Sequence, residues 1–218
     1  MDPERAFSAA DREAVRAAVA AVETETGGEV VPYVVGRCGD YRAACWAAAA
    51  LAAAIAAGVA ALAHDLGGFW GGSALVWVAL PVPLAALAGY ALTAAWPALR
   101  RRLIPSAALD DEVEMRAAAA FLEAEVFATR DRTGVLIFLA LFEHRVVILG
   151  DSGIAAKVEP GEWKAISDRL AAGIRRGEAA PALVEAIRAC GRLLVERRVE
   201  RRPDDIAELP DELRMRDE

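Results

Sequence analysis

The most prominent pattern in the chain is a long uncharged stretch between two polar parts. From position 43 to position 99, 57 residues contain a single formal charge, Asp65. His64–Gly68 divides the stretch into an apolar segment over 43–63 and a second one over about 69–99. Because a helix needs about 20 apolar residues to cross a bilayer, the first segment predicts one membrane span.

The second segment is longer than one straight span requires. We expect a bend or break at Pro81 and Pro83. An alanine-rich soluble hairpin is the alternative, but such a hairpin needs a polar face, and no Lys, Arg or Glu interrupts the 57 residues. Most Trp and Tyr side chains of the stretch lie near segment ends, as in membrane proteins. The pattern favours a two-helix transmembrane hairpin over 43–99.

The positive charges next to this hairpin predict its orientation. Arg37 and Arg42 precede it and Arg100–Arg102 follow it, whereas the connecting loop has no Lys or Arg. The positive-inside rule then places both polar parts and both termini in the cytoplasm. We therefore expect a multi-pass protein of the cell inner membrane, with the lipid bilayer as its first partner.

The polar part before the hairpin reads as a helix followed by a strand. Ser8 and Asp11 have the spacing of a capping box, and Gly27-Gly28 ends the helical pattern. Glu29–Val35 is rich in β-branched residues and predicts a strand. Because Pro32 cannot donate to a sheet, we expect this strand at an edge or with a bulge.

The polar part after the hairpin predicts three helices and two strands. Its strand over Gly134–Phe142 is apolar on both faces and so predicts a buried central strand. Helices are expected at about 107–128, 160–176 and 181–195, and a second strand at 146–149.

This order of elements predicts an α/β fold with a small mixed sheet, interrupted by the hairpin. A strand–helix–strand crossover makes the strand over 30–35 parallel to that over 134–141. The domains are then 1–42 plus 100–200 as one split α/β domain, 43–99 as the hairpin, and 201–218 as an acidic C-terminal extension. We expect that extension to be mostly solvated, or to dock through Ile206, Leu209 and Leu213 on the body or a partner.

The same topology gathers the candidate chemistry at one sheet edge, which we expect to be distal to the membrane. Glu29, the loop 129–134 and the loop Asp151–Gly153 meet there, whereas His144 lies at the opposite edge. Two arginines and two aspartates in these loops could bind and cleave a phosphate ester. The alternatives are a structural loop with paired charges, and a turn in which Asp151 caps and Gly153 takes positive φ.

Composition removes several other function classes. The net charge of −7 argues against a nucleic-acid partner. Three isolated cysteines and two histidines exclude a disulfide framework and a thiolate zinc site. We expect Cys38 and Cys45 to be inert, His144 to be a turn residue and Trp163 to be part of the core.

Four sequence blocks together resemble the bacterial TPM-domain membrane proteins, which are distant relatives of a thylakoid-lumen protein of photosystem II repair. The blocks begin at Thr26 (TGGEVVP), Thr129 (TRDRTGVLIF), Asp151 (DSGIAAKV) and Pro203 (PDDIAELP) and extend over about residues 7–213. The resemblance implies a TPM-like α/β/α sandwich, phosphatase activity and calcium binding.

Two functions follow from these observations. The first is a non-catalytic or accessory role in membrane-protein assembly or quality control, with membrane proteins as partners. The second is a divalent-cation-dependent phosphomonoester hydrolase of the TPM type, with Ca²⁺ or Mg²⁺ as candidate cofactors. In it Asp131 and Asp151 are the candidate catalytic residues, Arg130 and Arg132 bind phosphate, and Glu29 joins the two aspartates as a metal ligand.

Overall fold

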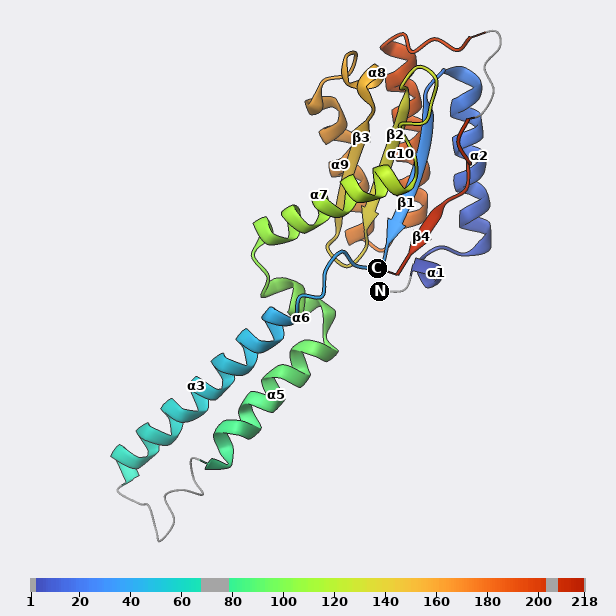
Figure 1. Cartoon of the computed structure of the whole chain (residues 1–218). Helices are drawn as coiled ribbons and strands as arrows, with labels where there is room; N and C mark the ends of the chain where they lie inside the picture. Colours follow the sequence, from blue (N-terminus) through green and yellow to red (C-terminus); the bar gives the residue numbers. More distant parts are fainter. Residues whose placement is uncertain (1–2, 68–78, 203–207, 218) are drawn as a thin grey trace. The chain divides into compact units, whose positions relative to one another are not determined.

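The computed structural model describes residues 3–67, 79–202 and 208–217. The chain divides into two compact units, which Figure 1 shows by colour along the sequence. The α/β unit comprises Met1–Gly39 and Leu109–Glu218, and the helical unit comprises Asp40–Ala108.

The elements are as follows. The helical unit contains α3 (Arg42–Gly67), α5 (Pro81–Ala95) and α6 (Pro97–Arg102), and α7 (Ser106–Glu123) begins at its end. The α/β unit contains α1 (Pro3–Ala6), α2 (Ala9–Glu25), β1 (Glu29–Val35), β2 (Gly134–Ala140), β3 (Arg145–Gly150), α8 (Ser152–Ala155), α9 (Pro160–Arg175), α10 (Ala179–Glu196) and β4 (Arg214–Arg216).

A four-stranded mixed sheet with the order β3-β2-β1-β4 forms the centre of the α/β unit. The two strands separated by the uncharged stretch pair in parallel, from Glu29 opposite Gly134 to Val35 opposite Ala140. This pairing confirms the predicted crossover. The β2–β3 pair is antiparallel, and β4 pairs in parallel with the other side of β1.

Helices cover both faces of this sheet, which explains why β1 and β2 are buried along their whole length. Alternate residues of the strands point to opposite faces. One face packs against α2, α9 and α10, and the other packs against α7 (Figure 1). As expected, Trp163 of α9 is a core residue, on the face of the sheet that packs against α2, α9 and α10.

Pro32 fits into β1 because of where β4 begins. The N–H of Gly36 donates to Arg216 of β4 (2.9 Å), and even-numbered residues of a strand share that direction. However, the pairing with β4 starts only at Tyr33. The nitrogen of Pro32 therefore points to the side of β1 where, in the described part of the chain, no strand pairs with its first residues. The strand β1 is an edge strand over this first half only.

The sequence predicted the start of α2 correctly but not the end of α7. The capping box of Ser8 and Asp11 is confirmed. The helix expected over 107–128 ends at Glu123, because Glu125 takes φ 52° and Val126 N donates to Phe121 O (3.2 Å). This is a Schellman end with glutamate at the position that glycine normally occupies, so no residue type there marks the end of the helix.

Residues 208–216 follow the second of the two expectations for the C-terminal extension, docking on the body, and not the first, a solvated segment. Arg214–Arg216 forms β4 and Leu209 is buried against the α7 side of the core. Of the proposed docking residues, Leu213 packs against the opposite core, whereas Ile206 lies outside the described residues. A strand of three residues with two arginines has no sequence signal, and it forms by pairing with the second half of β1, from Tyr33 to Val35.

In the helical unit, α3 and α5 pack against each other. The rings of Trp46 and Tyr90 are in contact, with centroids 5.0 Å apart and planes tilted by 57°. A Cβ atom at Gly89 would lie 2.9 Å from Ala48 O, so glycine lets the two backbones approach closely. The helix α3 runs through residues 64–67 of the expected turn because no breaker precedes Gly67, and position 68 lies outside the described residues.

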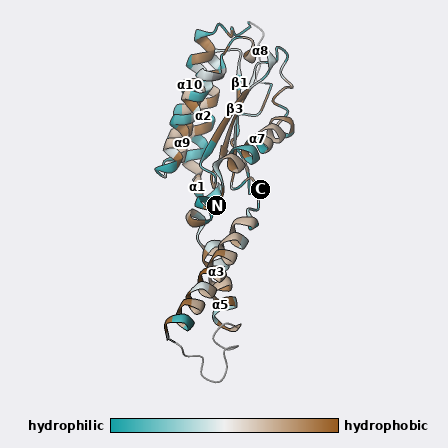
Figure 2. Ribbon diagram, turned by 90° about the vertical axis from the view of Figure 1, so that its left-hand side faces the viewer, coloured by the Kyte–Doolittle hydropathy of each residue, from teal (hydrophilic) through white to brown (hydrophobic). Residues whose placement is uncertain are grey.

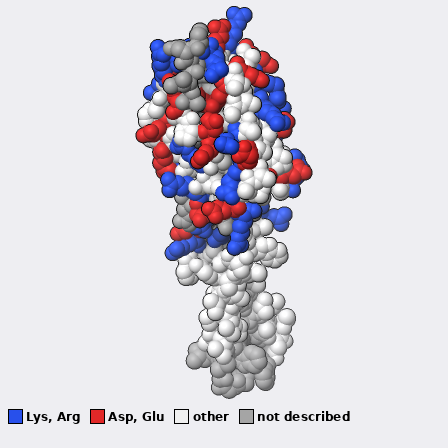
Figure 3. All heavy atoms as spheres, turned by 90° about the vertical axis from the view of Figure 1, so that its right-hand side faces the viewer, with Lys and Arg blue, Asp and Glu red and all other residues white. Residues whose placement is uncertain are grey.

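One described helix, α3, is long and apolar enough to cross a membrane. The apolar helix α5 is shorter, with 15 residues, and begins at the proline where a bend was expected. Both helices are predominantly apolar in Figure 2. In the face shown in Figure 3, charged side chains of both signs are mixed over the α/β unit, whereas the described part of α3 and α5 presents almost none.

Candidate functional site

The predicted site residues meet at the edge of the sheet where β1 and β2 begin and β3 ends, which we call the strand-start edge. Glu29 opens β1, Gly134 opens β2 and Asp151 directly follows β3. Backbone bonds join the loops there, since Glu29 N donates to Thr133 O (3.2 Å) and Asp151 N donates to Gly134 O (2.9 Å). The predicted gathering of these segments is confirmed.

Gly153 allows the two loops to come close. Its N–H donates to Arg132 O (3.0 Å), and a Cβ atom at this position would lie 2.4 Å from Asp131 O. Positive φ is not the reason for glycine here, because Gly177 is the only described glycine with that conformation. The expectation of a positive-φ turn at this position is therefore wrong, and close backbone approach is the physical reason for the glycine.

Asp151 is buried and has two structural partners. Its Oδ1 accepts from Ser152 N (2.6 Å) and so caps the short helix α8. Its Oδ2 forms an ion pair with Nε of Arg132 (2.7 Å), whose side chain is half exposed and also lies over the ring of Phe127. This candidate carboxylate therefore serves as a helix cap and one half of an ion pair.

The other two charged residues of the loop 129–134 bind the C-terminal part of the chain. Asp131 Oδ2 lies 2.9 Å from a guanidinium nitrogen of Arg202. The backbone N–H of Arg130 donates to Glu208 Oε2 (2.8 Å), and Arg202 also lies 3.9 Å from the Glu208 carboxylate. These contacts agree with the alternative of a structural loop with paired charges. The expected partners were neighbouring helices, whereas the observed ones, Arg202 and Glu208, lie outside any helix.

Glu29 holds the C-terminal strap, which we define as residues 208–216. Its carboxylate, buried to 7% exposure, accepts from Glu208 N (2.5 Å) and from Leu209 N (2.6 Å). The strap then continues to β4 along the free edge of β1. Sequence reasoning placed Glu29 at this edge but missed its role, because nothing in the sequence indicates which segment covers it.

A second acidic group beside Glu29 was not predicted. Burial, followed by the negative charges of Asp211 and Glu29, raises the pKa of Glu23 to about 8. The carboxyl group of Glu23 also accepts from Val30 N (3.4 Å), just after β1 begins. Three carboxyl groups from α2, β1 and the strap therefore interact electrostatically at this edge, and their repulsion favours a proton on Glu23.

The candidate metal ligands do not fit a divalent cation well as they are arranged. Calcium takes six to eight oxygen ligands and magnesium six. Here the oxygens of Glu29, Asp131 and Asp151 accept from N–H groups or pair with arginines. Within the described part of the chain, no group of three or more His, Cys, Asp or Glu side chains is placed to hold a metal ion.

The opposite edge of the sheet, where β1 and β2 end, contains a buried acid that the sequence analysis passed over. Glu143 is fully buried in the turn between β2 and β3, and its Oε1 accepts from Cys38 N (2.8 Å). His144 lies in the same turn with φ 53°, as expected for a turn residue. The sequence signal for Glu143 was weak, because a charged residue after a strand is normally exposed.

The surroundings of Cys38 support the expectation that its thiol has low reactivity. Burial and the nearby charge of Glu143 raise the pKa of Cys38 above its ordinary value. Burial alone raises the pKa of Cys190 to about 12. Since the thiolate is the reactive form, neither side chain is a good nucleophile at neutral pH.

Comparison with known proteins gives one significant structural likeness. No protein-family model matches the sequence, and no curated protein is significantly similar to it. The fold is similar to the NMR structure of BA42 protein from the psychrophilic bacterium Bizionia argentinensis, with a TM-score of 0.57 and 18% sequence identity. The likeness covers 96% of this chain and 94% of BA42, and at this identity it concerns the fold alone.

Proposed function

We propose that this chain is an integral protein of the cell inner membrane with a TPM-like α/β unit in the cytoplasm. In this proposal the α/β unit has a non-catalytic or accessory role in membrane-protein assembly or quality control. The likeness to BA42, which has a TPM-type fold, supports the TPM-like character of the fold.

The exposure of α3 supports insertion in a bilayer. Leu51, Ile55, Val59 and Leu62 are between 58% and 62% exposed, which is costly for a helix in water. A core helix of a soluble protein would bury these side chains. With α5 packed against α3, both helices form the proposed hairpin, in which α5 belongs to the second crossing.

Charge supports the proposed orientation. Arg37 and Arg42 precede α3, Arg100–Arg102 form the end of α6, and residues 43–99 contain no Lys or Arg. Basic residues on both sides of the hairpin favour the cytoplasm for both ends.

One observation carries the non-catalytic assignment: the charged groups at the strand-start edge already have structural partners. Asp151 caps α8 and pairs with Arg132, Asp131 pairs with Arg202, and Glu29 holds the strap. A catalytic carboxylate must instead reach a substrate, a metal or a proton. The edge is also the one where the parallel strands begin, whereas open α/β sheets normally bind ligands at the other end.

The alternative is a phosphomonoester hydrolase that uses a divalent cation. It is supported by the meeting of Asp131, Asp151 and two loop arginines at one edge, and it requires the strap and ion pairs to open. This is the reason to test it directly rather than to set it aside.

A phosphatase assay distinguishes the two functions. We expect the purified full chain, supplied with Mg²⁺ or Ca²⁺, to hydrolyse a phosphomonoester no faster than its Asp131→Asn and Asp151→Asn variants. Asparagine keeps a side-chain oxygen that can cap α8, so the second variant should fold. Turnover that needs the cation and is lost in both variants would instead support the hydrolase.

A further inference from the structure

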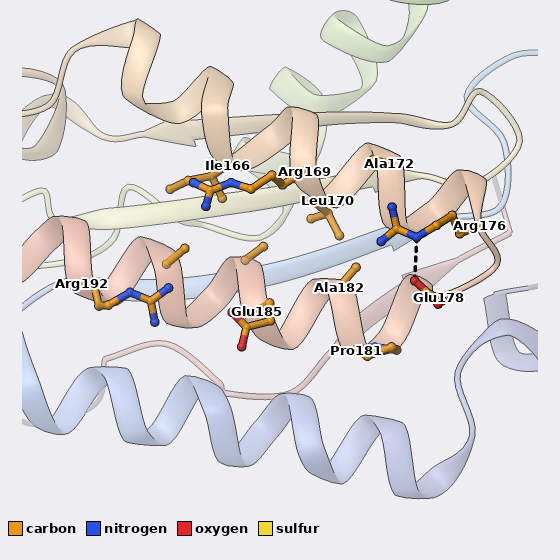
Figure 4. Close-up of a pocket in the computed structure, with 12 residues that line it drawn as sticks. Ile166, Arg169, Leu170, Ala172, Arg176, Glu178, Pro181, Ala182, Glu185 and Arg192 are labelled. Atoms are coloured by element: carbon orange, nitrogen blue, oxygen red, sulfur yellow. Dashed lines mark hydrogen bonds and ion pairs between the residues drawn. The ribbon is translucent and has the colours of Figure 1, made fainter.

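A groove of about 570 Å³ runs along the outer surface of the α/β unit between α9 and α10 (Figure 4). Its floor contains the buried side chains of Ile166, Leu170 and Ala186. Further alanines, among them Ala182, line its α10 side, so the groove wall is shallow and apolar. Small side chains of this kind let another helix approach a groove closely.

The charges around this groove are uneven. Arg169 and Arg192 line the end to the left of Figure 4, and in the described part of the chain neither has a carboxylate partner. At the other end, Arg176 is paired with Glu178 (2.8 Å). Glu185 lies between the two ends, 3.8 Å from Arg188. One end of the groove therefore has unpaired positive charge, and the other is close to neutral.

The outer face of α7 has the complementary pattern. A stripe opposite its buried face contains Asp111, Glu114, Met115, Ala118 and Leu122. Met115 is 63% exposed and Leu122 is 64% exposed, although both are large and apolar. In the described residues the two acids form no ion pair or hydrogen bond. The stripe is thus acidic toward the N-terminal half of α7 and apolar toward its C-terminal half.

We propose that the α9–α10 groove binds this outer stripe of α7 from a second copy of the chain. The acids Asp111 and Glu114 would meet Arg169 and Arg192, and Leu122 would lie beside Ala182 at the neutral end. Glu114 and Leu122 are eight helical steps apart, which is about 12 Å along α7. Arg169 and Arg176 are seven steps apart, which is about 10.5 Å along α9, so the two lengths match. The bound α7 therefore runs parallel to α9.

Charge also argues against lipid as the occupant of the stripe. The cytoplasmic surface of a bilayer is anionic and repels Asp111 and Glu114. Within one chain the stripe and the groove cannot meet, because α7 covers one face of the sheet and α9 and α10 cover the other. The contact is therefore heterologous, and its repetition builds a row or a closed ring of copies.

Disulfide trapping between two single-cysteine variants tests this contact in the full-length protein in liposomes. The native Cys38, Cys45 and Cys190 are first replaced by alanine. One variant then receives Leu122→Cys, and a differently tagged one receives Ala182→Cys. Mild oxidation of the mixture should give a mixed dimer, whereas Leu122→Cys mixed with Ala20→Cys, an exposed site on α2, should not.

Charge reversal tests the proposed orientation in the same assay. Arg169→Glu with Arg192→Glu in the Ala182→Cys protein should reduce the mixed dimer to the level of the Ala20→Cys control. Asp111→Arg with Glu114→Arg in the Leu122→Cys partner should restore it. Circular dichroism and thermal unfolding check that each variant is folded.

Two results would overturn the proposal. One is trapping between positions 122 and 182 that is no stronger than in the control, which is also the result if the groove takes an acidic helix of another protein. The other is trapping that does not respond to charge reversal, which would mean that the copies collide at random within the bilayer.

Discussion

At the scale of single residues, the strand-start edge depends on a glycine, Gly153, and on a protonated carboxyl group, that of Glu23. Gly153 lets the loop after β3 contact the backbone of the loop before β2. Glu23 keeps a proton because burial and two neighbouring carboxylates disfavour its charge. The sequence predicted the position of the first residue but not its reason, and it gave no sign of the second. Both effects come from contacts between segments that are distant in the chain.

Replacing Gly153 by alanine should lower the free energy of unfolding by about 2–3 kcal/mol, as is typical of overpacking in a closely packed site. The new Cβ atom would overlap the carbonyl oxygens of Asp131 and Arg132, which belong to backbone and cannot easily move. Gly161→Ala is the control, since no atom lies within 4 Å of that Cβ position. Denaturant unfolding measures both variants, and equal stability would contradict the assigned role of Gly153.

Replacing Glu23 by glutamine should change how stability depends on pH. The pKa of Glu23 is about 8 in the folded chain and about 4.5 when the group is unperturbed. Between these values the folded state binds an extra proton, so this residue makes the protein more stable as the pH falls from about 8 to about 4.5. Glutamine cannot ionise, and at pH 8.5 the variant should be more stable than the wild type by about 1–2 kcal/mol, since solvent screens a partly exposed group.

The control for this variant is Glu25→Gln on the same helix. Thermal unfolding between pH 5 and pH 9 gives the comparison. If the Glu23→Gln and wild-type profiles stay parallel over this range, the carboxyl group does not carry the extra proton.

At the scale of elements, the sequence predicted those helices and strands whose signals lie in neighbouring residues. The Ser8 cap and the apolar run of β2 are confirmed because each depends on neighbouring residues. The end of α7 at Glu123 and the strand β4 were missed. The first uses glutamate in a left-handed conformation, and the second exists because β1 has a free edge, which no local pattern reveals.

The strap should be released when its acceptor is removed. In Glu29→Ala the N–H groups of Glu208 and Leu209 lose the carboxylate that they bind. We expect faster hydrogen exchange over 208–216 and unchanged exchange in α9, because local opening depends on local contacts. Mass spectrometry of peptides from the two regions measures this, with Glu25→Ala as control. Unchanged exchange over 208–216 would mean that β4 and Leu209 alone fix the strap.

At the scale of the whole molecule, the candidate site illustrates how far topology can be read from sequence. The pairing of 29–35 with 134–140 followed from the order of elements, and it correctly brought Glu29, Asp131 and Asp151 to one edge. The partners of Glu29 and Asp131 did not follow, because Glu208 and Arg202 come from a segment whose path was not predicted. The predicted meeting of carboxylates is therefore a network of structural contacts.

The central claim is that a membrane hairpin interrupts one cytoplasmic α/β unit, and cysteine labelling in intact cells tests it most directly. In a cysteine-free background, Asp65→Cys should react with a membrane-impermeant maleimide, because it lies at the outer end of α3 in the proposed orientation. Ala20→Cys, exposed on α2, should react only after the cells are permeabilised. Labelling of position 20 in intact cells, or protection of position 65 in them, would contradict the account.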